Sequence, residues 1–358
     1  MDATTLEITT LESTATMAPD EGSLYATRSQ AVFVASVLII IGLLGLLGNL
    51  MVFLAVSLSR SLQDTTHVFV VSLAISDFIT SLALLFEGIS VLSETGWPFG
   101  SDLCKLSGAL LILTVPTSIV TLNAIAINRY VLITRSKTLF LKIYTRTHVA
   151  VMVAITWIVP FLVIVVPQLI PATGGLEYDP KSRFCSWDLE HNLLEVFRII
   201  LLVGSICCSI LIIFCYMAIL LFVRKQIKST KDRWRTSDVD TNKTKTPPSR
   251  LSKKQIDITI NLAIVVVVFF ICLLPYSINL ASYEDTLVTT LLYLLLTLST
   301  CINPVLYAVK HPTFKAVFKC MVSCRFKDIP HPSAWLKNVI KAPRPKPSEP
   351  TDTPSTDL

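Results

Sequence analysis

Three ionisable side chains lie within or at the end of long apolar runs, where charged residues are rare. Arg129 follows a charge-free apolar run from Leu106 to Ile127, and Asp77 and Glu87 interrupt an earlier apolar run. A charge is costly in hydrocarbon, so these side chains are expected to face a protein cavity, water or a partner group. A buried carboxylate among oxygen donors suits a small hard cation. The alternative for Asp77 and Glu87 is a structural hydrogen bond.

Seven long apolar runs must position these residues. The chain is 52% hydrophobic and 16% charged, with a mean hydropathy of +0.64, which is typical of a protein that crosses a membrane several times. Each run exceeds the ~20 residues that a membrane-spanning helix needs. The runs are 31–57, 66–92, 103–134, 148–170, 194–223, 256–283 and 286–309.

The basic residues predict the orientation of these spans. If the N-terminus is extracellular, 26 of the 31 Lys and Arg residues fall in cytoplasmic segments. This bias favours a multi-pass plasma-membrane protein with its N-terminus outside. The net charge of +6 is therefore interpreted as a topology signal, and nucleic acid is excluded as a partner.

The segments outside the spans differ in composition. Residues 1–30 are predicted to be a disordered extracellular tail, and the spans form a domain at 31–309 whose third cytoplasmic loop covers about 224–255. Residues 310–324 predict a short amphipathic helix on the membrane surface, with Phe314, Val317, Phe318 and Met321 on one side and lysines on the other. Residues 325–358 are predicted to be a disordered cytoplasmic tail.

The cysteines fall into three groups. Five lie within spans, where a small apolar side chain is the simplest interpretation. Cys104 and Cys185 are the only two outside, where oxidation is permitted, so a disulfide between them is predicted. Cys320 and Cys324 follow the amphipathic segment and are candidates for palmitoylation, with unmodified thiols as the alternative.

Two prolines interrupt the later spans. Pro275 lies two-thirds of the way through the sixth span, and Pro304 follows Asn303 near the inner end of the seventh. Proline removes a helical hydrogen bond and kinks the helix. Both positions are therefore predicted to be pivots.

A set of short motifs occurs in order along the spans: Gly48-Asn49, Leu73-Ala74-Ile75-Ser76-Asp77, Cys104, Asn128-Arg129-Tyr130, Trp157, Cys185, Tyr216, Cys272-Leu273-Leu274-Pro275 and Asn303-Pro304-Val305-Leu306-Tyr307. Taken together, these motifs resemble those of the rhodopsin-family (class A) G-protein-coupled receptors. The resemblance covers about residues 31–324 and implies an all-α membrane protein, a seven-transmembrane helix bundle with a short amphipathic eighth helix. It also implies signalling to a heterotrimeric G protein, so the chain is not expected to be an enzyme.

The resemblance also implies roles for individual residues. Arg129 is similar to the arginine that meets the G protein, and Tyr216 and Tyr307 are similar to the tyrosines that support the active state. The activation-switch set is Asn128, Arg129, Tyr130, Tyr216, Pro275, Asn303, Pro304 and Tyr307. No cofactor is implied, but an allosteric sodium ion is, and its pocket would be formed by Asp77, Ser118, Ser299 and Asn303.

Several positions depart from the family pattern. Asn128 replaces the acid that usually precedes the arginine, and Gln255 stands where many members have a glutamate. We therefore expect a weakly held inactive state with noticeable basal signalling. Leu273 replaces the usual tryptophan above Pro275, and Cys208 replaces the proline of the fifth span.

The implied ligand cavity opens between the outer halves of the spans. Leu111 stands where amine receptors have an aspartate, so it cannot pair with a protonated amine. The seventh span has no lysine before Lys310, which excludes a retinal Schiff base. The pocket candidates are Glu87, Leu111, Ile112, Val115, Tyr276, Leu280, Tyr293 and Thr297. This lining favours a small molecule, and the Asn-Arg-Tyr variant favours the melatonin-receptor-like and moody-like orphan group.

The sequence also bears on further partners and on other protein classes. The acidic outer segments keep a basic peptide as the alternative ligand. Thr356 and Leu358 fit a C-terminal ligand of a PDZ domain, and hydroxyl residues in the tail fit kinase sites that would recruit arrestin. A transporter would need an inverted repeat, and an intramembrane metalloenzyme would need ligands inside the bundle. A seven-helix adhesion or scaffold protein is the remaining rival.

Overall fold

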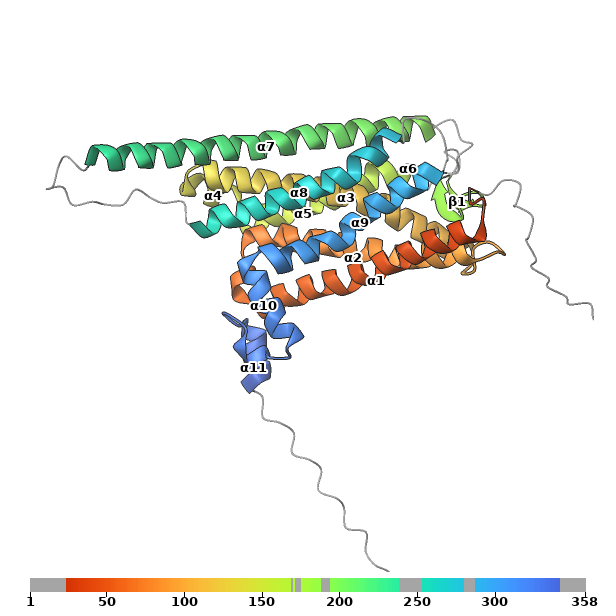
Figure 1. Cartoon of the computed structure of the whole chain (residues 1–358), viewed down its shortest axis with the longest axis horizontal. Helices are drawn as coiled ribbons and strands as arrows, with labels where there is room; N and C mark the ends of the chain where they lie inside the picture. Colours follow the sequence, from red (N-terminus) through yellow and green to blue (C-terminus); the bar gives the residue numbers. More distant parts are fainter. Residues whose placement is uncertain are drawn as a thin grey trace, which may run out of the picture.

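The computed structural model describes residues 24–168, 170, 175–187, 194–237, 253–279 and 287–341. Figure 1 shows long helices side by side with nearly parallel axes, crossed at one end by the shorter helices α10 and α11. The hairpin strand β1 lies at the opposite end. We call the end that carries Cys104 and Cys185 the disulfide end, and the end that carries Arg129 the arginine end.

Seven helical rods form the bundle. Six of them, within the described residues, are long and apolar enough to cross a membrane. The seventh is α8, whose described apolar stretch is Val267–Asn279. The rods are α1 (Arg28–Leu58), α2 (Thr65–Leu92), α3 (Ser101–Thr134), α5 (Arg146–Pro160) with its extensions η2 (Phe161–Val165) and α6 (Val166–Gln168), α7 (Leu194–Ser237), α8 (Lys253–Asn279) and α9 (Leu287–Lys310).

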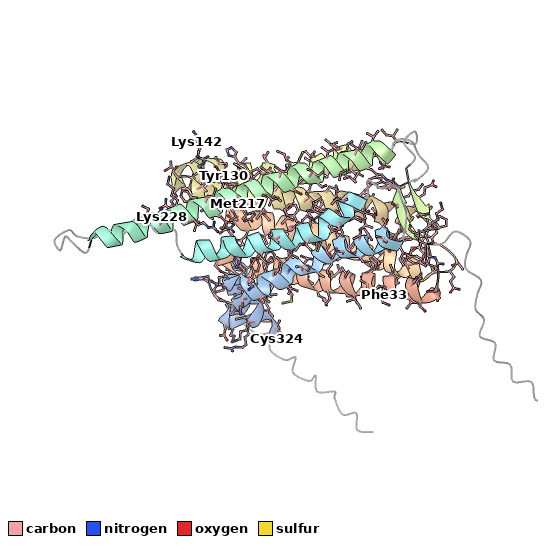
Figure 2. The ribbon with its side chains drawn as sticks, turned by 45° about the horizontal axis from the view of Figure 1, so that its top comes forward. Phe33, Tyr130, Lys142, Met217, Lys228 and Cys324 are labelled. Atoms are coloured by element: carbon pink, nitrogen blue, oxygen red, sulfur yellow. A yellow bond between two sulfur atoms is a disulfide. The ribbon has the colours of Figure 1, made fainter. Side chains whose placement is uncertain are left out.

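Short elements close the two ends. At the disulfide end, β1 (Leu176–Asp179) pairs antiparallel with β2 (Phe184–Trp187), and Tyr178 is opposite Cys185. The connections of the arginine end contain η1 (Arg60–Leu62) and α4 (Lys137–Ile143), and the segment after α9 forms α10 (Pro312–Val322), η5 (Phe326–Asp328) and α11 (Ala334–Lys341). Figure 2 shows Tyr130, Lys142, Lys228 and Cys324 toward the arginine end and Phe33 toward the other.

The burial pattern is the reverse of that of a water-soluble bundle. Asn49, Asp77 and Asn303 are buried, whereas Leu47 and Phe214 are among many large apolar side chains that are exposed. In a lipid solvent the apolar side chains face outward, and the backbone groups are satisfied within helices. Close approach of the rods relies on small residues: an added Cβ at Gly45 of α1 would collide with the side chain of Ser81 on α2.

Two boundaries differ from the sequence prediction. Helix α7 continues to Ser237, well into the loop predicted at 224–255, because the basic and polar run after the span still has good helix-forming residues. The tail predicted to be disordered from 325 is instead ordered to Lys341, since the segment after α10 pairs with the connection between α1 and α2. Residues 238–252 and 342–358 lie outside the described residues.

The amphipathic helix is confirmed, but its apolar face has a different neighbour. Phe314, Val317 and Phe318 are buried and belong to the core of the bundle. The ring of Phe314 stacks on that of Tyr307, with 5.3 Å between the centroids. This face therefore packs on protein, and α10 does not use it to contact lipid.

Candidate functional site

A cavity of about 230 Å³ lies at the disulfide end of the bundle. It is lined by residues of α2, α3, α7, α8, α9 and the hairpin, most of them apolar. Six of the eight predicted pocket residues line it, namely Glu87, Leu111, Ile112, Val115, Tyr276 and Tyr293. Thr297 does not, because it lies in the bundle below, where its hydroxyl donates to the carbonyl oxygen of Leu294 at 2.9 Å. Leu280 lies outside the described residues.

The sequence prediction missed the contribution of the hairpin. Phe184, Ser186 and Trp187 of β2 line the cavity, as does Leu24, which precedes α1. The ring of Phe184 lies against that of Tyr293, with the centroids 5.5 Å apart. The sequence could have indicated this contribution, because these residues flank Cys185, and the predicted disulfide joins Cys185 to the start of α3.

The disulfide holds β2 across the opening of the bundle. Cys104 and Cys185 are bonded, with their Cα atoms 5.3 Å apart, which confirms the predicted pairing. Gly108, one turn further along α3, lets the strand approach: an added Cβ would lie 2.9 Å from the carbonyl oxygen of Cys185. The hairpin therefore rests directly on the α3 backbone.

Glu87 is buried between α2, α3 and the hairpin. One carboxylate oxygen accepts a hydrogen bond from the Ser107 hydroxyl at 3.0 Å, and the other accepts from the backbone N–H of Cys185 at 3.1 Å. Its side chain is 0% exposed. Glu87 therefore fastens the hairpin to two helices while it also lines the cavity.

A second polar cluster surrounds Asp77 in the middle of the bundle. Its carboxylate accepts from the Ser118 hydroxyl at 3.1 Å and from the Asn303 amide at 2.8 Å. Ser299 does not take part, because its hydroxyl donates to the carbonyl oxygen of Leu296 at 2.7 Å. Three of the four predicted sodium-pocket residues are thus in contact. The neutral donors leave the negative charge of Asp77 without an ion pair in the described part of the chain.

The arginine end contains buried polar groups that lack hydrogen-bond partners within the described part of the chain. Arg129 is 5% exposed and makes no ion pair with any described residue, and its Nε is unpaired. Asn128 is also buried and interacts with the side chain of Tyr144, whereas the buried hydroxyls of Tyr216 and Tyr307 have no hydrogen-bond partner among the described residues. Arg129 interacts electrostatically with Asp64, Tyr216 and Tyr307. These groups converge from α2, α3, α7 and α9.

Asp64 caps the start of α2 at this end. Its carboxylate accepts from the backbone N–H groups of Thr66 and His67 at 3.1 and 2.9 Å and contacts the His67 ring at 2.6 Å. Burial alone would raise the pKa of Asp64, but the hydrogen bonds and charge of His67 outweigh it and lower the pKa to about 2. The carboxylate of Asp64 therefore interacts electrostatically with Arg129, although the two residues are far apart in the sequence.

The remaining predicted residues are distributed as follows. Tyr130 accepts a hydrogen bond from Arg135 at 3.0 Å, outside the Arg129 cluster. Pro275 and Pro304 lie inside α8 and α9. Cys320 is partly buried and Cys324 is exposed, both near the end of α10. Thr356 and Leu358 lie outside the described residues.

Comparison with known proteins gives a consistent relationship. Residues 48–307 match the family described as 7 transmembrane receptor (rhodopsin family). The human melatonin receptor type 1B is 27% identical over 80% of this chain and 76% of its own length. The Drosophila melanogaster G-protein coupled receptor moody is 24% identical over 88% of this chain and 55% of its own length. The crystal structure of squid rhodopsin has a TM-score of 0.69 at 20% identity, covering 90% of this chain and 93% of that chain, which shows a common fold.

The family match covers most of the bundle and all of its cavity-forming helices. Since the family consists of receptors, the prediction that the chain is not an enzyme is confirmed. The structure adds the disulfide, the cavity at one end and the buried arginine at the other. The chain belongs to the rhodopsin family of seven-transmembrane receptors.

Proposed function

We propose that this receptor binds a small, mostly apolar extracellular molecule in the cavity of the disulfide end and activates a heterotrimeric G protein at the arginine end. The observation that supports the proposal most directly is that a single helix, α3, contributes residues to both sites. Leu111 lines the cavity and Arg129 lies 18 residues further along α3, roughly 27 Å away at the helical rise per residue. A ligand that shifts α3 or its neighbours therefore acts on the arginine end directly.

The lining supports a small molecule over a basic peptide. Two acids, Glu87 and Asp179, line the cavity, and both already serve the hairpin. Glu87 accepts from Ser107 and Cys185, and Asp179 accepts from the backbone N–H groups of Lys181 and Ser182 at 3.0 Å each. The other walls are mostly aromatic and aliphatic, with the guanidinium of Arg198 and several hydroxyls, among them those of Tyr276 and Ser205. Such a site suits a flat apolar ligand with one or two hydrogen-bonding groups.

The membrane orientation is part of the proposal. With the disulfide end outside, the disulfide forms in an oxidising compartment and most basic residues lie in the cytoplasm. Arg129 is then reached by the G protein from the inside. Epitope tags on either terminus, stained in intact and permeabilised cells, test this. Staining of a C-terminal tag in intact cells would contradict it.

A ligand screen with a panel of G-protein activation sensors tests the function. Melatonin and related indoles belong in the screen because several relatives are named melatonin receptors. An agonist that uses the cavity should lose potency in Leu111→Trp, which fills it, and keep its potency in Leu106→Trp, which lies on the exposed side of the same helix. Equal potency in the two variants would contradict the cavity. Activation without any loss in Arg129→Ala would contradict the coupling site.

The Asp77 cluster supports an allosteric sodium ion. Its carboxylate is buried and makes no ion pair in the described part of the chain. It accepts hydrogen bonds from the Asn303 amide and from the Ser118 hydroxyl, which is itself bonded to the Ser76 hydroxyl. A carboxylate beside hydroxyl oxygens suits a small hard cation. Sodium there would hold the helices in the closed arrangement. Raising NaCl against choline chloride should raise the unfolding temperature of the wild type but not of Asp77→Asn. Equal shifts would contradict the site.

Further partners follow from the ends of the chain. We infer that Cys320 and Cys324 carry palmitate, that the tail recruits arrestin after phosphorylation, and that Thr356 and Leu358 bind a PDZ domain. Metabolic labelling of Cys320→Ser and Cys324→Ser, and a pulldown with and without Leu358, test two of these. If agonists never promote nucleotide exchange, the adhesion or scaffold alternative is favoured.

A further inference from the structure

The segment after α10 is fastened to the connection that follows α1. The backbone N–H of Arg60 donates to the carbonyl oxygen of His331 at 2.8 Å, and that of Ser333 donates to the carbonyl oxygen of Leu58 at 2.9 Å. The Ser59 hydroxyl donates to the carbonyl oxygen of Pro330 at 2.7 Å. This antiparallel bridge fixes the start of α11 beside the last turn of α1. Figure 1 shows α11 there, next to α10 and outside the bundle.

Helix α11 begins at a defined point. The Ser333 side chain accepts a hydrogen bond from the backbone N–H of Leu336 at 3.2 Å, which caps the helix. Leu336 and Ile329 are each 3% exposed and belong to the bundle core. The helix is therefore held at one side while its other sides point away from the protein.

The outward sides of α11 are strongly amphipathic. Trp335, Val339 and Ile340 are 61%, 52% and 38% exposed, and their spacing puts them on one stripe with the buried Leu336. Lys337 and Asn338 lie on the other side of the helix, and both are exposed. An exposed tryptophan with two exposed aliphatic side chains in an eight-residue helix calls for an apolar neighbour.

Two observations identify that neighbour as lipid. First, the lipid-facing surface of α1 continues to Leu54, one turn before Leu58, so the bridge holds α11 at the boundary of the membrane. Second, residues 310–340 contain six Lys or Arg residues against one Asp, a formal charge of +5 that complements an anionic membrane surface. The face of α10 that would otherwise bind lipid is already buried in the bundle.

We propose that α11 is a membrane-surface helix, which inserts Trp335, Val339 and Ile340 into the interface of a leaflet that contains anionic lipid. Tryptophan is favoured at this depth because its ring is apolar and its N–H reaches the headgroups. That the leaflet is the cytoplasmic one rests on the proposed function.

The test uses the full chain in nanodiscs that hold one receptor each. One disc contains only phosphatidylcholine, and the other also contains phosphatidylserine. In each, the difference in tryptophan fluorescence between the wild type and Trp335→Phe isolates the signal of Trp335. We expect lipid brominated near the headgroup to quench this signal at least about twofold more than aqueous iodide does, with stronger quenching in the anionic disc. Quenching by iodide alone would overturn the proposal.

Amide hydrogen exchange gives an independent readout. The triple variant Trp335→Lys, Val339→Lys and Ile340→Lys changes only exposed side chains, so the bridge to α1 should survive. Exchange over 335–341 should rise by roughly tenfold or more, while Asn338→Lys, on the polar side, should leave it unchanged. Equal exchange in both variants would overturn the proposal. So would protection that appears only in discs with two receptors, since a second copy would then cover the helix.

Neither readout involves ligand or G protein, so a failure of the proposed function leaves this test intact. The orientation of the receptor in the membrane determines which leaflet α11 contacts, and the staining of epitope tags measures this orientation separately. A receptor that signals normally but shows no quenching of Trp335 by lipid would overturn only the role of α11.

Discussion

The two ends of the bundle differ in how they accommodate a buried charged side chain. At the disulfide end both oxygens of Glu87 accept hydrogen bonds, and a covalent bond joins Cys104 to Cys185. At the arginine end Arg129 is buried, and its Nε has no hydrogen-bond partner among the described residues. Satisfied networks rigidify a structure, whereas unsatisfied buried groups are costly and favour rearrangement. The comparison indicates that the disulfide end is rigid, whereas side chains at the arginine end can exchange their interaction partners.

The largest expected effect concerns the disulfide. Its loop spans 81 residues, and removal of such a cross-link is expected to cost about 4 kcal/mol in the chain-entropy description. Cys104→Ser should therefore lower the unfolding temperature sharply and abolish the response to any cavity ligand. Cys324→Ser, an exposed thiol at the other end, is the matched control. A Cys104→Ser protein as stable as that control would contradict a rigid disulfide end.

The second effect concerns Glu87. Glu87→Ala leaves the N–H of Cys185 and the hydroxyl of Ser107 buried without an acceptor, at a cost of about 2–3 kcal/mol. We expect a lower unfolding temperature and faster amide exchange in β2. Glu94→Ala removes an exposed carboxylate nearby and should change neither. Unchanged exchange in β2 would show that the hairpin does not depend on this carboxylate.

The third effect concerns the missing acid beside Arg129. Asn128→Asp introduces a carboxylate next to the guanidinium, and a gain of about 1 kcal/mol for the inactive state would lower basal G-protein nucleotide exchange about fivefold. Asn128→Ser, which is neutral, should not lower it. Equal basal exchange in the wild type and Asn128→Asp would remove the argument that the arginine end is weakly held.

The smallest effect concerns Asp64. Its pKa is lowered to about 2 in the folded protein, below the ordinary value near 4, so its charge stabilises the fold above about pH 4. This contribution is lost as the pH falls toward 2, and it is under about 1 kcal/mol because the side chain is 60% exposed. Asp64→Asn keeps a capping side chain and should flatten this part of the stability curve, measured by thermal unfolding between pH 6 and 3. A curve as steep as that of the wild type would assign the pH dependence elsewhere.

Much of the bundle could be predicted from the chain because lipid imposes a simple rule. A run of about 20 apolar residues must form a helix, so the positions of the spans, and of Pro275 and Pro304 within them, follow directly. The structure of residues 310–341 could be predicted only in part. The apolar periodicity of 310–324 predicts a helix, but periodicity does not state whether its neighbour is lipid or protein, and Phe314 turned out to face Tyr307.

What the sequence determined by itself is the set of membrane-spanning helices and the pairing of Cys104 with Cys185, because these depend on local composition and on which cysteines lie outside the spans. What only the tertiary structure decided is which polar groups meet. Ser299 turned to its own helix while Ser118 reached Asp77, and the tail after α10 bonded to Leu58 and Arg60. These outcomes depend on helix rotation and on contacts between residues far apart in the chain. Neither can be predicted from a local sequence pattern.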